Sequence, residues 1–191
     1  MKPNTLEPAL GSGDVPEWIE ADGLVLRRWE RDDLDARYDA IITSFPHLHP
    51  WMDWATEPPT EQEHRERFER ARRWPSDGSY NFGVFDRRGG AILGMAAVHD
   101  HLGPGAVEIG YWCHVDHLGR GVASRSVGEL TRILLSLPRI NRVEIHCDEA
   151  NLRSAALAER LGYRLDRIED DGVNAPAESG RGMVWIKENR A

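Results

Sequence analysis

The sequence has few cysteines and no long apolar segment. Two of its 191 residues are cysteines, Cys113 and Cys147, which is too few for a disulfide framework and gives no metal-binding spacing. No apolar run approaches the length of about 18 residues that a membrane-spanning helix needs. Residues Met1 to Thr5 lack the apolar stretch of a secretory signal. We therefore expect a cytoplasmic protein with no membrane partner, no bound metal and two buried, reduced thiols.

Positive charge is also scarce. The chain has 24 Lys and Arg against 32 Asp and Glu, a formal net charge of -8. A protein that holds nucleic acid through phosphate contacts needs the opposite balance, so no nucleic-acid partner is expected. The negative charge favours a substrate that carries positive charge, such as an amine or a basic peptide N-terminus.

The length of the chain indicates one globular domain with a full core. Residues 1–15 contain Pro3, Pro8 and a Gly11-Ser12-Gly13 run, and we expect them to form a loosely ordered N-terminal arm. Residues 16–191 are expected to form the domain itself.

The most informative segment is the turn Asp116–Ala123, which joins a strand-like run at 107–113 to a helix-like run from 123 to about 137. Its two glycines, Gly119 and Gly121, let the backbone approach a ligand closely. The helix start directs unpaired N–H groups into the turn, which is typical of a phosphate or pyrophosphate site. The Lys-Ser/Thr of a P-loop and the third glycine of a dinucleotide fingerprint are both missing. Taken alone, the glycine pair fits either an anion site or an ordinary tight turn.

The next forty residues continue with strands and helices in a definite order. Apolar residues three and four apart predict the helix at 123–137, and alternation of polar and apolar residues predicts a strand at 142–147. A second helix is expected at 151–161, with Gly162 in the left-handed conformation after it. A further strand is expected at 163–168.

This order resembles the GCN5-related N-acetyltransferase (GNAT) superfamily. The segments that are similar to its ribosomal-protein N-terminal acetyltransferase (RimJ/RimL-like) branch are Glu108-Ile109-Gly110-Tyr111-Trp112, Gly119-Arg120-Gly121, Asn151-Leu152-Arg153-Ser154 and Leu161-Gly162-Tyr163. The resemblance is close over residues 106–168 and loose from about residue 22 to the C-terminus. It implies an α/β fold, a single GNAT-like domain with a mixed, mostly antiparallel, V-shaped central sheet flanked by helices.

The resemblance also implies where acetyl-CoA binds. Its pyrophosphate would lie on the main-chain N–H groups of Leu118, Gly119, Arg120, Gly121, Val122 and Ala123. The pantetheine arm would enter between diverging strands at 108–115 and 142–147, beside the backbone of Cys113 and Val115. Asn151 would bind the pantetheine region, and Ser154 would lie near the cofactor or its thiol. Leu118 departs from the family pattern, which favours Gln or Arg, and the Arg120 side chain is either a phosphate ligand or a solvated arginine.

Acetyl transfer to an amine needs a base, a polarised carbonyl and an acid for the leaving thiolate. The resemblance assigns the base to Glu108, acting through an ordered water; the alternative is an exposed strand glutamate that only aids solubility. Some relatives use as acid a tyrosine whose position is occupied here by Ala158. Ser154 is the nearest substitute, and solvent or the incoming substrate would serve equally well.

The first hundred residues are expected to form the acceptor side. The predicted elements are a strand at 23–29, a helix from Asp32 to about Thr43, a proline-punctuated loop at 45–54, a helix at 60–74 and paired strands at 79–85 and 91–99. Trp51 and Trp54 either wall the substrate pocket or pack over the helix pair. The histidines at 47, 49, 99 and 101 are expected to be loop, turn or strand-end residues rather than metal ligands.

These features predict an N-acetyltransferase that moves an acetyl group from acetyl-CoA to a primary amine by direct attack, the amine being that of a protein N-terminus. Two alternatives stay open: a small-molecule amine such as an antibiotic, polyamine or amino sugar, and a CoA-binding sensor without turnover. The pocket between 45–54 and the polar loop 169–182 would be deep and acidic for a small amine, and an open groove for a peptide. Aromatics near residue 50 and a strand at 183–186 leave a homodimer open.

Overall fold

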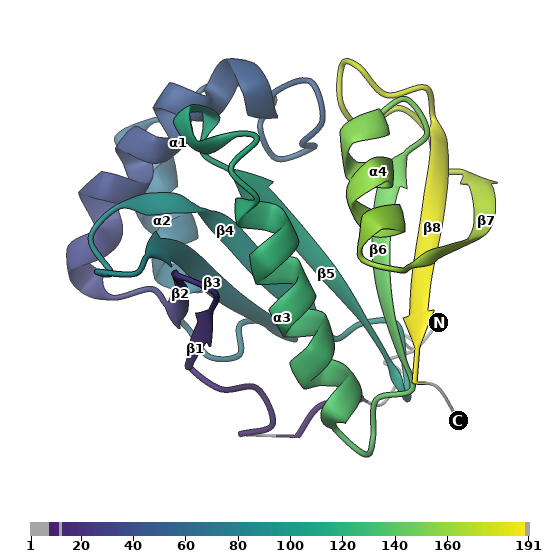
Figure 1. Cartoon of the computed structure of the whole chain (residues 1–191). Helices are drawn as coiled ribbons and strands as arrows, with labels where there is room; N and C mark the ends of the chain where they lie inside the picture. Colours follow the sequence, from purple (N-terminus) through teal and green to yellow (C-terminus); the bar gives the residue numbers. More distant parts are fainter. Residues whose placement is uncertain (1–7, 12, 190–191) are drawn as a thin grey trace, which may run out of the picture.

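The computed structural model describes residues 8–11 and 13–189. Its strands are β1 (Trp18–Ala21), β2 (Leu24–Arg28), β3 (Ser79–Asp86), β4 (Ile92–His99), β5 (Ala106–Cys113), β6 (Arg142–Asp148), β7 (Arg164–Asp170) and β8 (Arg181–Glu188) (Figure 1). The α-helices are α1 (Leu34–Leu48), α2 (Glu61–Ala71), α3 (Val122–Ser136) and α4 (Leu152–Arg160), and two short 3-10 helices are η1 (Arg31–Asp33) and η2 (Val115–His117). Across these ranges, no helix is long and apolar enough to cross a membrane.

The strands form one sheet in the order β1-β2-β3-β4-β5-β6-β8-β7. All neighbours pair antiparallel except β5 and β6, which run parallel. This confirms the predicted mixed, mostly antiparallel sheet. Strand β1 was not predicted, because its four residues are too short for a periodic pattern. It pairs with β2 across a tight turn in which Asp22 and Gly23 both have positive φ, the geometry that suits a two-residue hairpin loop.

The two parallel strands separate partway along their length. Their register contains three pairs, the last of which is Glu108 with Glu144. Beyond that point β5 stays paired with β4 as far as Cys113, and β6 stays paired with β8 as far as Asp148. Figure 1 shows the two strands meeting at one end and diverging toward the other. The predicted V-shaped opening is therefore confirmed.

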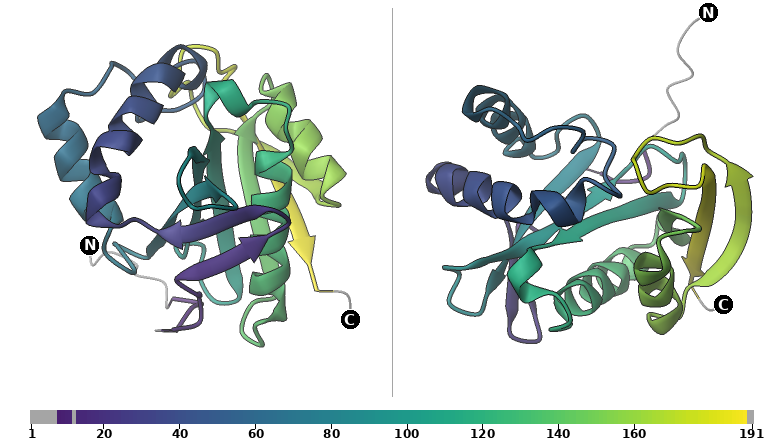
Figure 2. Two further views of the ribbon diagram at one scale, coloured as in Figure 1. Left: turned by 60° about the vertical axis from the view of Figure 1, so that its left-hand side comes forward. Right: turned by 90° about the horizontal axis from the view of Figure 1, so that it is seen from above.

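Helices cover both faces of the sheet: α3 and α4 lie on one side, and α1 and α2 on the other (Figure 2). The apolar stripe predicted for α3 is buried, and the side chains of Val127, Leu130 and Leu134 are fully inaccessible to solvent. These side chains join the larger core beneath α3. A second core under α1 and α2 is built around Trp29 and Phe68, so each helical layer has its own apolar support.

Helix α1 is longer than the sequence indicates. It runs through Pro46 to Leu48, so the first part of the predicted loop at 45–54 is helical. Proline removes one intrahelical hydrogen bond, yet the buried side chains Ile41, Ser44 and Leu48 continue one face of the helix through this point. Burial of that face outweighs the tendency of Pro46 to end the helix. Helix α2 begins after Thr60, which forms a reciprocal capping box with Glu63, and it ends at Ala71 rather than at residue 74 as predicted.

The described part of the N-terminal arm packs on the domain. Ala9, Leu10 and Val15 are buried in the larger core. The N–H groups of Ala9 and Leu10 each donate to the Asp100 carboxylate at 2.8 Å. Residues 9, 10 and 15 are therefore not loosely held as expected, because two hydrogen bonds and apolar burial fix them. Residues 1–7 and 12 lie outside the described residues.

Candidate active site

A cavity of about 1240 Å³ opens where β5 and β6 separate. It is lined by both strands, by the start of α3, by α4 and by the segment between α1 and α2. Most of the predicted site residues line it: Trp51, Trp54, Glu108, Cys113, Leu118, Gly119, Gly121, Val122, Ala123, Asn151 and Ser154. Val115 and Arg120 do not. One continuous cavity thus brings together residues that are 100 positions apart in the sequence.

The turn before α3 has the geometry of an anion site. Gly119 and Gly121 have φ values of 71° and 72°, the left-handed region that favours glycine. A Cβ at Gly119 would meet no neighbouring atom, so the space above the turn is open. Within the described chain, no acceptor is found for the N–H groups of residues 119–122. These donors, at the positive end of α3, can bind a diphosphate.

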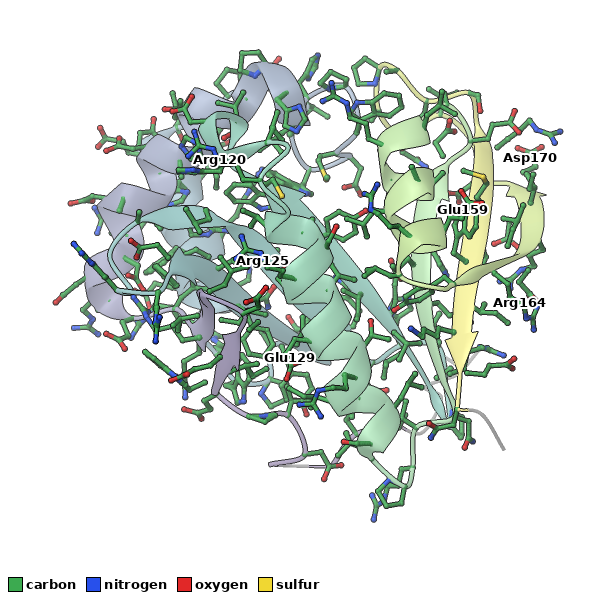
Figure 3. All side chains as sticks on the ribbon, viewed as in Figure 1. Arg120, Arg125, Glu129, Glu159, Arg164 and Asp170 are labelled. Atoms are coloured by element: carbon green, nitrogen blue, oxygen red, sulfur yellow. The ribbon has the colours of Figure 1, made fainter. Side chains whose placement is uncertain are left out.

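Arg125 holds this turn in place and was not singled out from the sequence. Its guanidinium donates to the carbonyls of Arg120 at 3.1 Å and Gly121 at 3.3 Å, and to the carbonyl of Asp22 in the β1–β2 turn at 2.6 Å. Figure 3 shows Arg125 near the start of α3, with Arg120 in the turn above it. Because Arg125 engages the carbonyls, the N–H groups of the turn stay available to a ligand. The Arg120 side chain is exposed, and its one described contact is a long one of 3.5 Å to Nδ1 of His117.

The edge of β5 that faces the gap can be read from its pairing with β4. The His114 N–H donates to the Leu93 carbonyl on the β4 side. Alternation along an antiparallel strand then turns the main-chain groups of Ile109, Tyr111 and Cys113 toward β6. Cys113 was predicted there, whereas Val115 is already engaged: its N–H donates to Ser44 Oγ of α1 at 3.1 Å. The backbone N–H of Val115 therefore has a partner within the protein.

The wall beside α4 holds an unpredicted tyrosine. Asn151 caps α4, and its side-chain oxygen accepts the N–H of Ser154. The Ser154 hydroxyl shares a hydrogen bond of 2.7 Å with the phenol of Tyr111, which reaches across from β5. Burial raises the pKa of Tyr111 to about 12, and the hydrogen bond to Ser154 opposes part of that rise. The sequence signal was the Gly-Tyr-Trp run, but nothing local indicated that its tyrosine would meet α4. Ala158, at the position of the family tyrosine, is fully buried.

Both cysteines lie near this wall. Cys113 and Cys147 are free thiols, and both are half-buried rather than fully buried as predicted. Burial raises the pKa of each thiol. At neutral pH they are therefore protonated, weakly polar groups lining the gap.

Glu108 sits among histidines on the opposite face of the sheet. Its side chain is 19% exposed, and its carboxylate lies 3.4 Å from Nε2 of His101 and 3.8 Å from Nδ1 of His146. His99 is its register partner on β4. A glutamate kept only for solubility would be largely exposed, so this enclosure favours the functional interpretation. The histidines were expected to be turn and strand residues. Their convergence on one carboxylate was missed because it depends on three separate strands.

His146 is in turn anchored by Glu144, which is almost fully buried. The His146 Nε2 and a Glu144 carboxylate oxygen are 2.6 Å apart, and Arg142 contacts the other carboxylate oxygen at 2.7 Å. Burial disfavours the charged imidazole, but the hydrogen bond to Glu144 and the charges of Glu108 and Glu144 outweigh it and raise the pKa of His146. In Glu144, burial is likewise outweighed by His146 and Arg142, and its pKa is lowered.

The acceptor side is bordered by the two predicted segments. Trp51 and Trp54 are half-buried and line the cavity, while Trp54 also packs on the core under α1 and α2. Lining the pocket and packing over the helix pair, the two roles considered for these tryptophans, are therefore compatible. The Ala177 N–H donates to the Pro50 carbonyl at 2.9 Å, so the loop between β7 and β8 touches the segment after α1. Within residues 8–11 and 13–189, no group of three or more His, Cys, Asp or Glu could hold a metal ion.

Comparison with known proteins identifies the class. Residues 23–164 match the family model described as an acetyltransferase (GNAT) domain, which covers most of the chain. The protein therefore belongs to the GNAT acetyltransferase family, as its resemblance indicated. It is an acetyltransferase that takes its acetyl group from acetyl-CoA.

Individual relatives agree with this assignment. The curated "Putative ribosomal N-acetyltransferase YdaF" of Bacillus subtilis (strain 168) is 26% identical over 155 residues, which is 78% of this chain and 82% of the relative. The structure of RimL, a ribosomal L7/L12 alpha-N-protein acetyltransferase in complex with coenzyme A, matches with a TM-score of 0.80 and 19% identity, covering 90% of this chain and 98% of RimL. The microcin C7 self-immunity acetyltransferase MccE, in complex with acetyl-CoA and AMP, matches with a TM-score of 0.81 and 18% identity over 94% and 100%. These structural matches confirm the predicted fold.

Proposed function

We propose that this acetyltransferase modifies the α-amine of a protein N-terminus by direct attack on acetyl-CoA. The observation that carries the proposal is the placement of Glu108 at the point where β5 and β6 separate. It faces the α1–α2 side, on the same face of β5 as Trp112, whereas Tyr111 and Cys113 pack toward α3. An amine arriving from one side and a thioester lying in the gap would therefore meet beside a carboxylate. The names of YdaF and RimL support a ribosomal-protein N-terminus as the acceptor.

The cofactor would be held mainly by main-chain groups. The pyrophosphate would accept hydrogen bonds from the N–H groups of residues 119–122, whereas the Leu118 N–H, also expected there, donates to the Val115 carbonyl within the protein. The pantetheine arm would pair with the free edge of β5 at Ile109, Tyr111 and Cys113, filling the place that β6 leaves. Asn151 and Ser154 would line its path from the α4 side. Val115 would support the turn through Ser44 rather than contact the arm.

The reaction would proceed without a covalent acyl-enzyme. Glu108, through a water, would accept a proton from the amine nitrogen as that nitrogen bonds to the acetyl carbon. The carbon–sulfur bond would then break, and its electron pair would pass to sulfur. The Tyr111 phenol, hydrogen-bonded to Ser154, would protonate the thiolate and recover its proton from solvent through the serine. Alignment of amine and thioester would supply much of the rate.

The experiment mixes the protein with acetyl-CoA and matched acceptors, and follows thiol release and the acetylated position by mass spectrometry. We expect peptides with a free α-amine to react, and the same peptides with a blocked N-terminus and a free lysine not to react. Turnover of small amines alone would replace the proposal by the small-molecule alternative. Tight CoA binding without turnover of any amine would favour the sensor. The cavity wall carries both acids and arginines, so its charge does not by itself separate the two acceptor classes.

A further inference from the structure

Arg37 is a buried cation that has no acidic partner in the part of the chain that the structure describes. It lies on α1, is 8% exposed, and lines the cavity on the acceptor side. Its guanidinium packs over the rings of Trp29 and Phe68. One polar contact is described, a long one of 3.5 Å to Nδ1 of His64, and its Nε has no partner among the described residues. In the same set of residues, no carboxylate lies within ion-pair distance of it.

Two further arginines line the same wall. Arg67 and Arg70 lie on α2 and border the cavity, and neither forms an ion pair within the described chain. Arg67 donates to the carbonyl of Trp54 at 3.0 Å, which fixes its side chain at the cavity edge. We name Arg37, Arg67 and Arg70 the cationic wall.

Among the described residues, no carboxylate forms an ion pair with this wall, and the nearest acidic influence is that of Glu63 on Arg67 along α2. Burial, and then the charge of Arg67, lower the pKa of Arg37 to about 10, so it remains a cation at neutral pH. Burial and the same arginines lower the pKa of His64 to about 4, so the imidazole between them is neutral. Burying an unpaired charge is costly. The chain has eight more acidic than basic side chains, 32 against 24, yet none in residues 8–11 and 13–189 forms an ion pair with the cationic wall.

We propose that the cationic wall binds a carboxylate carried by the acceptor, close to its reactive amine. The inference rests on the proposed function for the acceptor side of the cavity. For a peptide acceptor, the carboxylate belongs to an acidic side chain that follows the N-terminal residue. A guanidinium presents a planar fork of donors that matches the two carboxylate oxygens. The acceptor would thereby supply the counter-charge that the fold leaves out, and the same contact would orient the amine toward Glu108.

The test compares peptides of one length and one N-terminal residue that carry Glu, Gln or Lys directly after it. For the wild-type protein we expect kcat/KM to be about 10-fold higher with Glu than with Gln, the size of a charge-assisted contact, and lowest with Lys. The variant Arg37→Met keeps much of the apolar stem and removes the charge. We expect it to bring the Glu and Gln peptides to nearly equal kcat/KM. Equal values in the wild-type protein would overturn the proposal.

Controls separate a binding role from a structural one. Arg65→Gln removes the same charge from the exposed face of α2, outside the cavity, and should keep the preference for Glu. Should Arg37→Met fail to fold, Arg67→Gln combined with Arg70→Gln alters the less buried part of the wall and should reduce the preference. The affinity for CoA should be the same in all variants. A loss of CoA affinity in Arg37→Met would place this charge on the cofactor instead and would contradict the proposal.

Failure of the cationic wall as a carboxylate site can be distinguished from failure of the proposed function. Should no peptide be acetylated, the N-terminal acceptor is wrong, and the wall is tested alone with glutarate as a probe. Glutarate should raise the melting temperature of the wild-type protein and of Arg65→Gln, and leave that of Arg37→Met unchanged. Equal shifts in all of them would overturn the cationic wall as a carboxylate site.

Discussion

The phenol of Tyr111 and the hydroxyl of Ser154 are 2.7 Å apart and join β5 to α4 across the opening of the sheet. This contact occupies the region where the leaving thiolate is expected, and the family position at 158 is an alanine. We therefore expect Tyr111, which comes from β5 on the opposite wall, to act as the proton donor in place of a tyrosine at position 158.

Replacing Tyr111 by Phe should lower kcat by about 100-fold, in the range of lost general acid catalysis. KM for acetyl-CoA should change little, because the ring remains. Steady-state kinetics across alkaline pH checks this. Tyr38→Phe is the matched control, since Tyr38 does not line the cavity and its hydroxyl donates to the Pro59 carbonyl at the cavity edge. A kcat for Tyr111→Phe within about twofold of wild type would exclude the proton-donor role.

Replacing Glu108 by Gln should remove the base while keeping the shape of the side chain. We expect kcat/KM for the amine to fall by about 100-fold at neutral pH. Glu129→Gln on α3, whose partner is Arg132, provides the control. A Glu108→Gln variant that keeps kcat/KM within about twofold of wild type would leave this glutamate a purely structural residue.

His146 should make stability depend on pH. Its pKa is raised above the ordinary value of 6.5 in the folded protein, against the effect of burial, by the hydrogen bond to Glu144 and by nearby carboxylates. Its contribution is therefore complete below about pH 6.5 and is lost as pH rises through the raised pKa. The groups that face it are Glu108, Glu144 and Arg167.

The measurement is the melting temperature of the wild-type protein and of His146→Gln from about pH 5 to pH 9. The difference between them should be largest at the acid end of this range and should shrink as pH rises. A difference that stays constant across this range would mean that the imidazole does not gain its proton more readily in the folded state.

Replacing Gly119 by Ala should weaken CoA binding by more than its effect on folding explains. Gly119 and Gly89 have nearly equal φ values, 71° and 72°, and a Cβ would meet no atom at either. Each substitution should cost about 1 kcal/mol of stability from the left-handed backbone. Only Gly119→Ala puts a methyl group where we propose that the pyrophosphate binds. Calorimetry should show a higher Kd for CoA in Gly119→Ala and an unchanged Kd in Gly89→Ala. Equal Kd values would remove the turn from the phosphate site.

Local patterns in the sequence determined the half of the molecule from the turn before α3 to α4, where we propose that the cofactor binds. The two glycines, the start of α3, the apolar stripe Val127–Leu130–Leu134 and the Asn151 cap all depend on residues within a few positions of one another. Each is set by backbone freedom, by helical periodicity or by a cap, so each could be predicted without knowing the rest of the fold. The length of α1 could not, since burial of Leu48 overrides the local effect of Pro46.

Only the tertiary structure decided what surrounds the reacting atoms. His146 reaches Glu108 because the register of β5 and β6 places both side chains on one face, and a shift of one residue would turn it away. His101 reaches the same carboxylate from the loop after β4. Tyr111 meets Ser154, and Arg37 stands beside Arg67, through contacts between segments 30 to 43 positions apart. Such contacts depend on how elements pack, and packing is settled by burial over the whole chain rather than by the residues of any one segment.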